Sequence, residues 1–214
     1  MIQQSTFEKT LEEFDLRESR SDFFGLASKL MRDGYKIEAY LLLLATWNFA
    51  RFRYAVKDFN VDTFTETVQK LEPDFESLAH LTIATANLDV HRHQITSIFK
   101  TLSQIRGVEY TGAPKLMHLR NPAFFVMWDE YIRGEKPKKL YARLPIVQSG
   151  DWVFCRYAKS SDSYFEFLKD MQARFSHLTT LDQRKTLAKA IDEFNYVSIT
   201  LPIQQWEKQR KKAK

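Results

Sequence analysis

The spacing of apolar side chains is the feature that most restricts how this chain can fold. Apolar residues recur every three or four positions, as in Phe7, Leu11 and Phe14, or Ile95, Ile98, Phe99 and Leu102. This period is typical of amphipathic α-helices. Only 6 of the 214 residues are Gly and 6 are Pro, which argues against a turn-rich all-β fold and a Gly-rich phosphate loop. The sequence therefore predicts an all-α fold, a compact bundle of several helices.

Start and stop signals divide this pattern into elements. We expect helices over residues 21–31, 36–54, 64–72, 75–85, 95–106, 113–119, 122–132 and 163–175, and a last one that ends near 196. Residues 134–162 are the least regular and are expected to form a loop or a hairpin. Pro73 and Pro202 are expected to end the helices before them, because proline lacks the N–H that a helix needs. We expect one domain over residues 1–206, with two subdomains flanking a cleft as an alternative arrangement, and a flexible basic tail over 207–214.

The net charge of +5 is unevenly distributed along the chain. Residues 1–99 carry 11 Lys and Arg against 15 Asp and Glu, whereas residues 100–143 carry 9 against 4 and residues 207–214 carry 5 against 1. A local basic patch is the footprint expected of a polyanion-binding protein. Lys136, Lys138 and Lys139 form its densest part and are candidates to follow a nucleic-acid backbone. The alternative is an ordinary solvated face with a frayed basic end.

The cysteine and histidine content bears on location and on metal binding. Cys155 is the only cysteine, so an internal disulfide and a Cys-based zinc site are excluded. A single thiol and the lack of an apolar leader in the first 30 residues fit a reducing, cytoplasmic location. His91 and His93 would diverge on a helix, and no metal site and no cofactor are expected. The most apolar stretch, residues 39–47, is too short to span a bilayer, so no membrane partner is expected.

Residues 102–133 carry the clearest functional signal. They read LSQIRGVEYTGAPKLMHLRNPAFFVMWDEYIR. This pattern predicts the end of one helix, a tight turn at Gly107 and the start of a new helix. Such a turn presents backbone N–H groups at a helix N-terminus, which suits a phosphate. The segment resembles the hairpin and Asp-bearing helix, here over residues 95–133, of the helix-hairpin-helix superfamily of base-excision DNA glycosylases. The resemblance is carried by Ile105-Arg106-Gly107-Val108, by Ala113, and by Trp128-Asp129 followed by Ile132-Arg133.

The resemblance implies a DNA partner and a set of functional residues. Asp129 would be the catalytic carboxylate, and hairpin contacts to DNA would come from Gly107, Val108, Tyr110, Thr111 and Gly112. Two departures matter: Glu109 replaces the second glycine of the hairpin, and Thr111 stands where bifunctional enzymes carry a nucleophilic lysine. Lys115, one helical turn further on, is the nearest substitute. The resemblance thus implies a glycosylase that only hydrolyses the N-glycosidic bond, rather than one that also cuts the strand.

Other residues of the segment complete the expected site. His118 and Arg120 lie in the same basic stretch and are candidate phosphate contacts. A base flipped out of the duplex needs an aromatic pocket, for which Trp47 and Trp128 are the candidates, although core packing explains such aromatics more simply.

Each role has a structural alternative. Asp129 can instead pair with Arg133 one turn later or cap a neighbouring helix. The chain can be a non-catalytic helical module that kept the hairpin for nucleic-acid or protein contact, or a helical interaction protein unrelated to DNA. In that last case the cations of residues 100–143 would be scattered over the surface.

Overall fold

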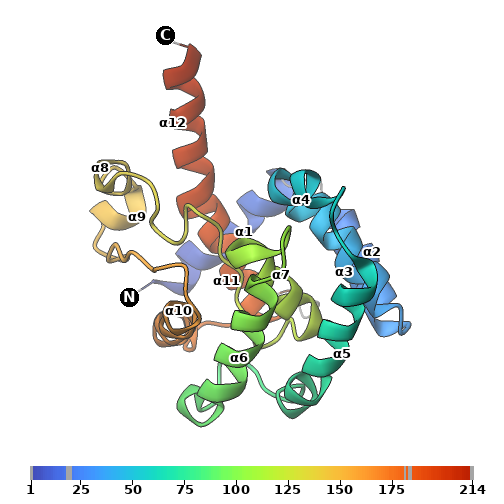
Figure 1. Ribbon diagram of the computed structural model, residues 1–214. Coiled ribbons are helices and arrows are strands. Elements are labelled where there is room, and N and C mark those ends of the chain that lie inside the picture. Colours follow the sequence, from blue (N-terminus) through green and yellow to red (C-terminus); the bar gives the residue numbers. More distant parts are fainter. Residues whose placement is uncertain (1, 18–20, 181, 183–184, 213–214) are drawn as a thin grey trace.

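The chain folds almost entirely into helices in a computed structural model that describes residues 2–17, 21–180, 182 and 185–212 (Figure 1). Within these ranges no β-strand occurs, and no helix is both long and apolar enough to cross a membrane. The helical elements are α1 (Gln4–Arg17), α2 (Ser21–Arg32), α3 (Lys36–Trp47), α4 (Phe49–Ala55), α5 (Val61–Ser77), η1 (Leu88–His91), α6 (Arg92–Ser103), α7 (Glu109–Arg120), α8 (Lys138–Tyr141), α9 (Pro145–Gln148), α10 (Ser161–Phe175), α11 (Leu187–Asn195), η2 (Tyr196–Thr200) and α12 (Leu201–Lys212). The all-α prediction is therefore confirmed.

Helices α6 and α7 form the centre of the molecule. Helix α6 packs against α5, α7 and α10, while α7 also contacts α2 and α3 (Figure 1). The apolar face of α6 carries Phe99, whose ring stacks on Tyr164 of α10 at 4.6 Å between centroids and meets Trp128 edge-on at 5.7 Å. Aromatic pairs of this kind add to the free energy gained by burying the rings. This cluster lies directly beneath the candidate site.

Two prolines that were expected to end helices lie inside or within the first turn of a helix. Pro73 lies in α5, which runs unbroken to Ser77 and leaves no separate helix over residues 75–85. The ring of Pro73 is exposed, and so is Gln69, whose carbonyl has lost its helical donor and is left to water. A proline on the solvent side of a helix is thus tolerated here. Helix α3 in turn ends at Trp47, so the helix expected over 36–54 is two helices that meet at Asn48.

The helix also continues past Pro202. Helix α11, the five-residue π-helical turn η2 and α12 follow one another without interruption, and the Leu201 N–H donates to the Tyr196 carbonyl five residues before it. π-helical turns are rare and occur mostly as single turns inside longer α-helices, as η2 does here. Residues 207–212, which were expected to be a flexible tail, form the end of α12.

Residues 121–137 contain no helix, which contradicts the helix expected over 122–132. Five consecutive apolar residues, 124–128, are all buried, so this stretch has no polar face to turn toward water. Its carbonyl groups are instead satisfied by buried side chains: Nδ1 of His118 contacts the Phe125 carbonyl at 2.5 Å, and the Tyr164 hydroxyl donates to the Val126 carbonyl at 3.0 Å. Buried backbone polar groups need such partners. The segment thus crosses the core as an irregular chain.

The Gly107 turn is closely packed under α4. Gly107 has φ of +90°, and a Cβ atom there would lie 2.7 Å from the Cβ of Ala55 and 3.2 Å from the ring of Phe52. Both the backbone conformation and the available space therefore require glycine.

We expect Gly107→Ala to lower the free energy of unfolding by about 2 to 4 kcal/mol, since it combines an unfavourable φ with a steric overlap. Gly25→Ala in α2 is the matched control, because nothing lies within 4 Å of a Cβ at that position. The control should leave stability unchanged or raise it by up to about 1 kcal/mol. Urea unfolding of the three proteins measures both effects. Equal stability of Gly107→Ala and the wild type would show that the turn is not packed as described.

Candidate functional site

A pocket of about 370 Å³ lies where α3, α4, α7 and the α11–α12 helix meet. Five of the residues selected from the sequence line it, namely Trp47, Thr111, Lys115, Trp128 and Asp129. They come from three separate stretches of the chain. Other lining residues were not expected, among them Phe14, Asn48, Asp192, Tyr196 and Gln204. The pocket therefore combines side chains from parts of the chain that are far apart in the sequence.

The Asp129 carboxylate is half-buried and held by three hydrogen bonds. Its Oδ1 accepts from the backbone N–H groups of Tyr131 and Ile132, each at 2.8 Å, and its Oδ2 accepts from the Thr200 hydroxyl at 2.8 Å. Burial raises the pKa of this carboxyl above its ordinary value, while the hydrogen bonds and the positive charge of Lys115 act against that rise. The group is thus a strongly oriented acceptor beside the pocket.

Asp129 does not form the ion pair with Arg133 that was considered from the sequence. The Arg133 guanidinium pairs with Glu135 at 2.5 Å and lies 5.6 Å from the centre of the Trp128 ring. By accepting from the second and third N–H groups that follow it, the Asp129 side chain caps the turn over residues 129–134. Asp129 therefore caps its own turn rather than the neighbouring helix that was considered, and Thr200 supplies its third hydrogen bond.

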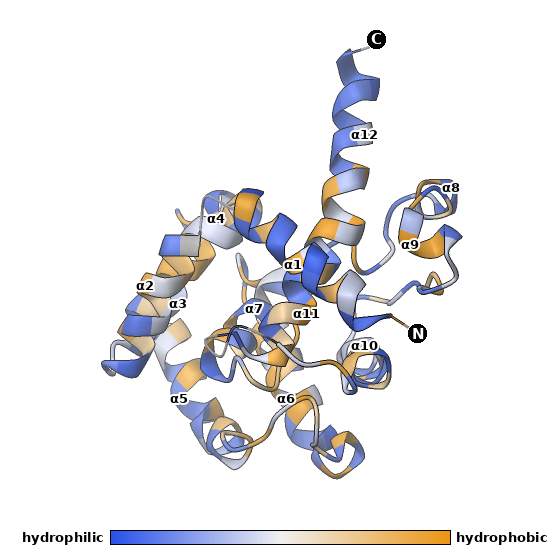
Figure 2. Ribbon diagram, turned by 180° about the vertical axis from the view of Figure 1, so that it is seen from behind, coloured by the Kyte–Doolittle hydropathy of each residue, from blue (hydrophilic) through white to orange (hydrophobic). Residues whose placement is uncertain are grey.

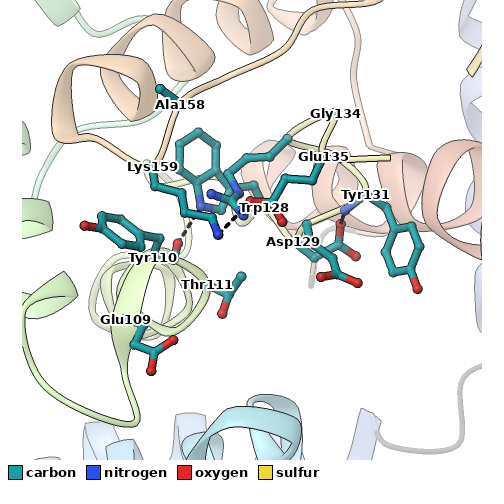
Figure 3. Close-up of polar contacts among 12 residues, drawn as sticks. Glu109, Tyr110, Thr111, Trp128, Asp129, Tyr131, Gly134, Glu135, Ala158 and Lys159 are labelled. Atoms are coloured by element: carbon teal, nitrogen blue, oxygen red, sulfur yellow. Dashed lines mark hydrogen bonds and ion pairs between the residues drawn. The ribbon is translucent and has the colours of Figure 1, made fainter. Parts of the chain in front are cut away.

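Trp128 is held in place through a proline in α7. Pro114 has no N–H, so the carbonyl of Tyr110 four residues earlier has no helical donor. The Trp128 indole N–H donates to this carbonyl at 2.7 Å, and Figure 3 shows Trp128 between Tyr110 and the turn that begins at Asp129. The side chain next to Asp129 is thereby fixed to α7.

Thr200 reaches Asp129 because it is the last residue of the π turn η2. A π turn contains one more residue than the α-helical turn it replaces, which rotates the side chains that follow relative to a regular helix. Thr200, whose hydroxyl contacts the carboxylate, therefore belongs to the irregular turn itself.

Asp192 of α11 is a second carboxyl group in the pocket wall. Burial raises its pKa to about 6, and the negative charge of Glu193 acts in the same direction, while the Lys189 ammonium at 3.4 Å opposes the rise. A carboxyl group with this pKa exchanges protons near neutral pH. Asp192 could have been found only from its place directly after Ile191 in a partly apolar stretch of helix. The structure shows that most residues of this helix are buried.

Lys115, Asn48 and Thr111 connect the pocket to the Gly107 turn. Lys115 donates to the Trp47 carbonyl at 2.5 Å, at the C-terminus of α3 where a cation is favourable. Asn48 donates to the Gly107 carbonyl at 2.8 Å, and the Thr111 hydroxyl donates to Oδ1 of Asn48 at 3.3 Å. Asn48, which sequence reasoning missed, thus joins the turn to the pocket.

The turn itself does not offer the expected phosphate site. Gly107 and Val108 are buried, and the N–H groups of Val108 and Glu109 both donate to the Ile105 carbonyl at 3.1 Å. Gly112 is buried as well, inside α7 against Leu44 and Asn48. In this conformation these residues cannot contact a DNA backbone. Tyr110 is half-buried.

Glu109 adopts a backbone conformation that glycine favours. Its φ is +52°, in the left-handed region, and its carboxylate pairs with Arg51 at 3.2 Å. This is the position where Glu replaces the second glycine of the hairpin motif. Both glycine positions of the resemblance therefore keep a positive φ in this chain.

Two residues expected to contact phosphate are engaged inside the protein. His118 is fully buried, and burial together with the charge of Lys189 lowers its pKa to about 3. Arg120 pairs with Glu72 at 3.1 Å and with Glu76, and its side chain is 15% exposed. The structure thus places the His118 ring inside the core and engages the Arg120 guanidinium in ion pairs, rather than leaving either side chain free at the surface.

The remaining candidates differ in their exposure. Lys136 pairs with Glu130 at 2.9 Å, whereas Lys138 and Lys139 are exposed on α8. Trp47 is half-buried beneath the ammonium of Lys189, which lies 4.8 Å from its ring centre. Trp128 is 1% exposed, so its contact with the pocket is small. Of the two indoles, Trp47 therefore offers the larger surface to a ligand.

Within the described ranges, His, Cys, Asp and Glu side chains do not gather in groups of three or more that would suit a metal ion. Comparisons with protein-family models, with curated proteins and with solved structures find no match to this chain. The site is therefore interpreted from its own geometry.

The buried, neutral state of His118 predicts an acid-sensitive fold. Its pKa is about 3 in the folded protein and about 6.5 in an unfolded chain, so below pH 6.5 the unfolded state binds a proton that the folded state does not. The stability that depends on neutral His118 is present above pH 6.5 and is lost as the pH falls toward 3, by up to about 1.4 kcal/mol per pH unit. We expect His118→Gln to be less stable at pH 7 but to lose less stability between pH 6 and pH 4.

Urea unfolding at a series of pH values measures this difference. His80→Gln is the matched control, because His80 is exposed, and it should keep the pH dependence of the wild type. A His118→Gln protein with the same pH dependence as the wild type would refute the assignment of a neutral ring.

Proposed function

We propose that this protein binds a nucleic acid and hydrolyses the N-glycosidic bond of a nucleotide whose base enters the pocket. The observation that carries the proposal is that Asp129, Lys115 and Trp47 line one pocket, which brings a carboxylate, a cation and an indole ring together. The resemblance to helix-hairpin-helix DNA glycosylases over residues 102–133 supports the same chemistry. Damaged or mismatched bases are the expected substrates, because they unpair most easily.

The reaction would use the fixed negative charge of Asp129. Water adds to C1′ of the sugar, and the base departs with the electrons of the broken bond and takes up a proton, which leaves an abasic site. Positive charge develops on the sugar as the bond breaks, and a buried, preorganised carboxylate stabilises such charge better than water does. Asp192, with a pKa of about 6, is suited to supply or accept the proton.

One observation favours a second candidate, the non-catalytic nucleic-acid-binding module. All three hydrogen bonds to Asp129 come from the protein itself and hold the turn and η2 together, which is also what a purely structural carboxylate does. A module of this kind would bind DNA and release no base.

Base release from a panel of duplexes separates the two candidates. The panel carries deaminated, oxidised and alkylated bases and mismatches, and abasic products are revealed by alkaline cleavage. We expect release from at least one duplex, strand cutting only after alkali, and at least about a 100-fold loss of rate in Asp129→Asn. The Asn side chain can still accept from the N–H groups of Tyr131 and Ile132, so the turn should be retained.

Asp62→Asn is the matched control, because Asp62 is exposed on α5 and should keep full activity. Thermal unfolding of each variant separates loss of the fold from loss of chemistry. No release from any duplex while binding persists would refute hydrolysis and favour the module. No binding to any duplex would refute both.

A further inference from the structure

Helix α12 and the α8 region lie side by side, although some 60 residues separate them in the sequence (Figures 1 and 2). The Arg143 guanidinium lies 4.5 Å from the centre of the Trp206 ring. Lys136 and the Tyr131 hydroxyl both contact the Glu207 carboxylate, at 3.7 and 3.1 Å. These contacts fix the direction in which α12 leaves the body of the molecule.

The two segments together carry a surface of one charge sign. We call it the basic edge, and it consists of seven exposed cations: Lys138, Lys139, Arg143, Lys208, Arg210, Lys211 and Lys212. Lys139, Arg143 and Arg210 line one shallow hollow between the segments. No ion pair joins any of the seven to an acidic side chain of the described ranges. Like charges at this density repel one another, and an anionic partner relieves that repulsion.

The shape of α12 limits the kind of partner. Ile203 is its only buried residue, and beyond Trp206 it carries no large apolar side chain, so it lacks the apolar face by which a helix inserts into a lipid surface. Its hydrophilic end is visible in Figure 2. The cations are instead arranged along a helix and an adjacent turn, an arrangement that can contact several phosphates of one strand.

The basic edge also begins close to the pocket. Gln204 lines the pocket, and Arg210 follows six residues later on the same helix, a rise of about 9 Å at 1.5 Å per residue. Measured along the helix axis, the basic edge therefore begins within about 9 Å of a residue that lines the pocket. At the Gly107 turn, by contrast, the N–H groups of Val108 and Glu109 donate within the turn, and Gly107 itself packs under α4.

We propose that the basic edge binds the phosphodiester backbone of a nucleic acid duplex and replaces the Gly107 turn as the main backbone contact. The identity of the pocket's substrate rests on the proposed function, but binding along the edge does not. The contact would be independent of sequence and strongly dependent on salt.

Fluorescence anisotropy with an undamaged, labelled duplex between 50 and 250 mM salt tests the proposal. The variant Lys139→Gln, Arg210→Gln, Lys211→Gln should bind roughly tenfold or more weakly, and its plot of log affinity against log salt should lose about 2 to 3 units of slope. The control variant Lys29→Gln, Arg32→Gln, Lys70→Gln removes the same charge from exposed cations of α2 and α5 and should keep the wild-type slope. Circular dichroism confirms that both variants fold, and neither removes Arg143 from Trp206.

Three outcomes would overturn the proposal: an unchanged slope in the edge variant, equal losses in both variants, or equally tight binding of the wild type to polyglutamate. Undamaged DNA is used so that failure of base release does not affect the result. Salt-dependent binding at the basic edge with no base release from any duplex would refute the proposed hydrolysis but not the backbone contact. Base release by a protein whose edge variant keeps the wild-type salt slope would refute the backbone contact but not the hydrolysis.

Discussion

The position of the Asp129 carboxylate depends on two irregular helices that meet around it. In α7, Pro114 leaves the Tyr110 carbonyl available for the Trp128 indole, which holds the residue before Asp129. In the α11–α12 helix, the π turn before Pro202 ends at Thr200, whose hydroxyl donates to the carboxylate. Each proline would ordinarily weaken its helix, and here each accompanies a contact that a regular helix would not make. The site is thus organised by local departures from ideal helical geometry.

This arrangement explains how a charged group is kept beside an apolar core. A buried carboxylate is costly unless it is hydrogen-bonded, and Asp129 accepts three hydrogen bonds and lies in the field of Lys115. The same contacts that compensate for burial also fix its orientation. The stability of the fold and the orientation of the carboxylate therefore depend on the same contacts. Asp192, in the wall of the same pocket, adds a carboxyl group whose pKa is about 6.

Sequence patterns predicted the regular part of the fold well and the site only in part. The spacing of Phe7, Leu11 and Phe14 identified α1, because one buried face has a helical period. Period alone could not reveal that residues 124–128, apolar on every side, cross the core without forming a helix. The distant partners were invisible for a related reason: Thr200 is 71 residues from Asp129, and only the three-dimensional path of the chain brings them together. The resemblance singled out Asp129 and Lys115, which line the pocket. The sequence did not reveal that His118 is buried and that Arg120 is ion-paired, because charge in a sequence does not report burial.

The central claim is that the base of a bound nucleotide occupies the pocket, and the four tryptophans of the chain are natural reporters of it. Trp47 and Trp128 line the pocket, while Trp152 packs against Phe175 away from it. We expect that a duplex carrying a mismatched pair, added to ¹⁵N-labelled protein, shifts the indole N–H signals of Trp47 and Trp128 and leaves that of Trp152 in place. Saturating binding that leaves the Trp47 and Trp128 signals unmoved would contradict the account.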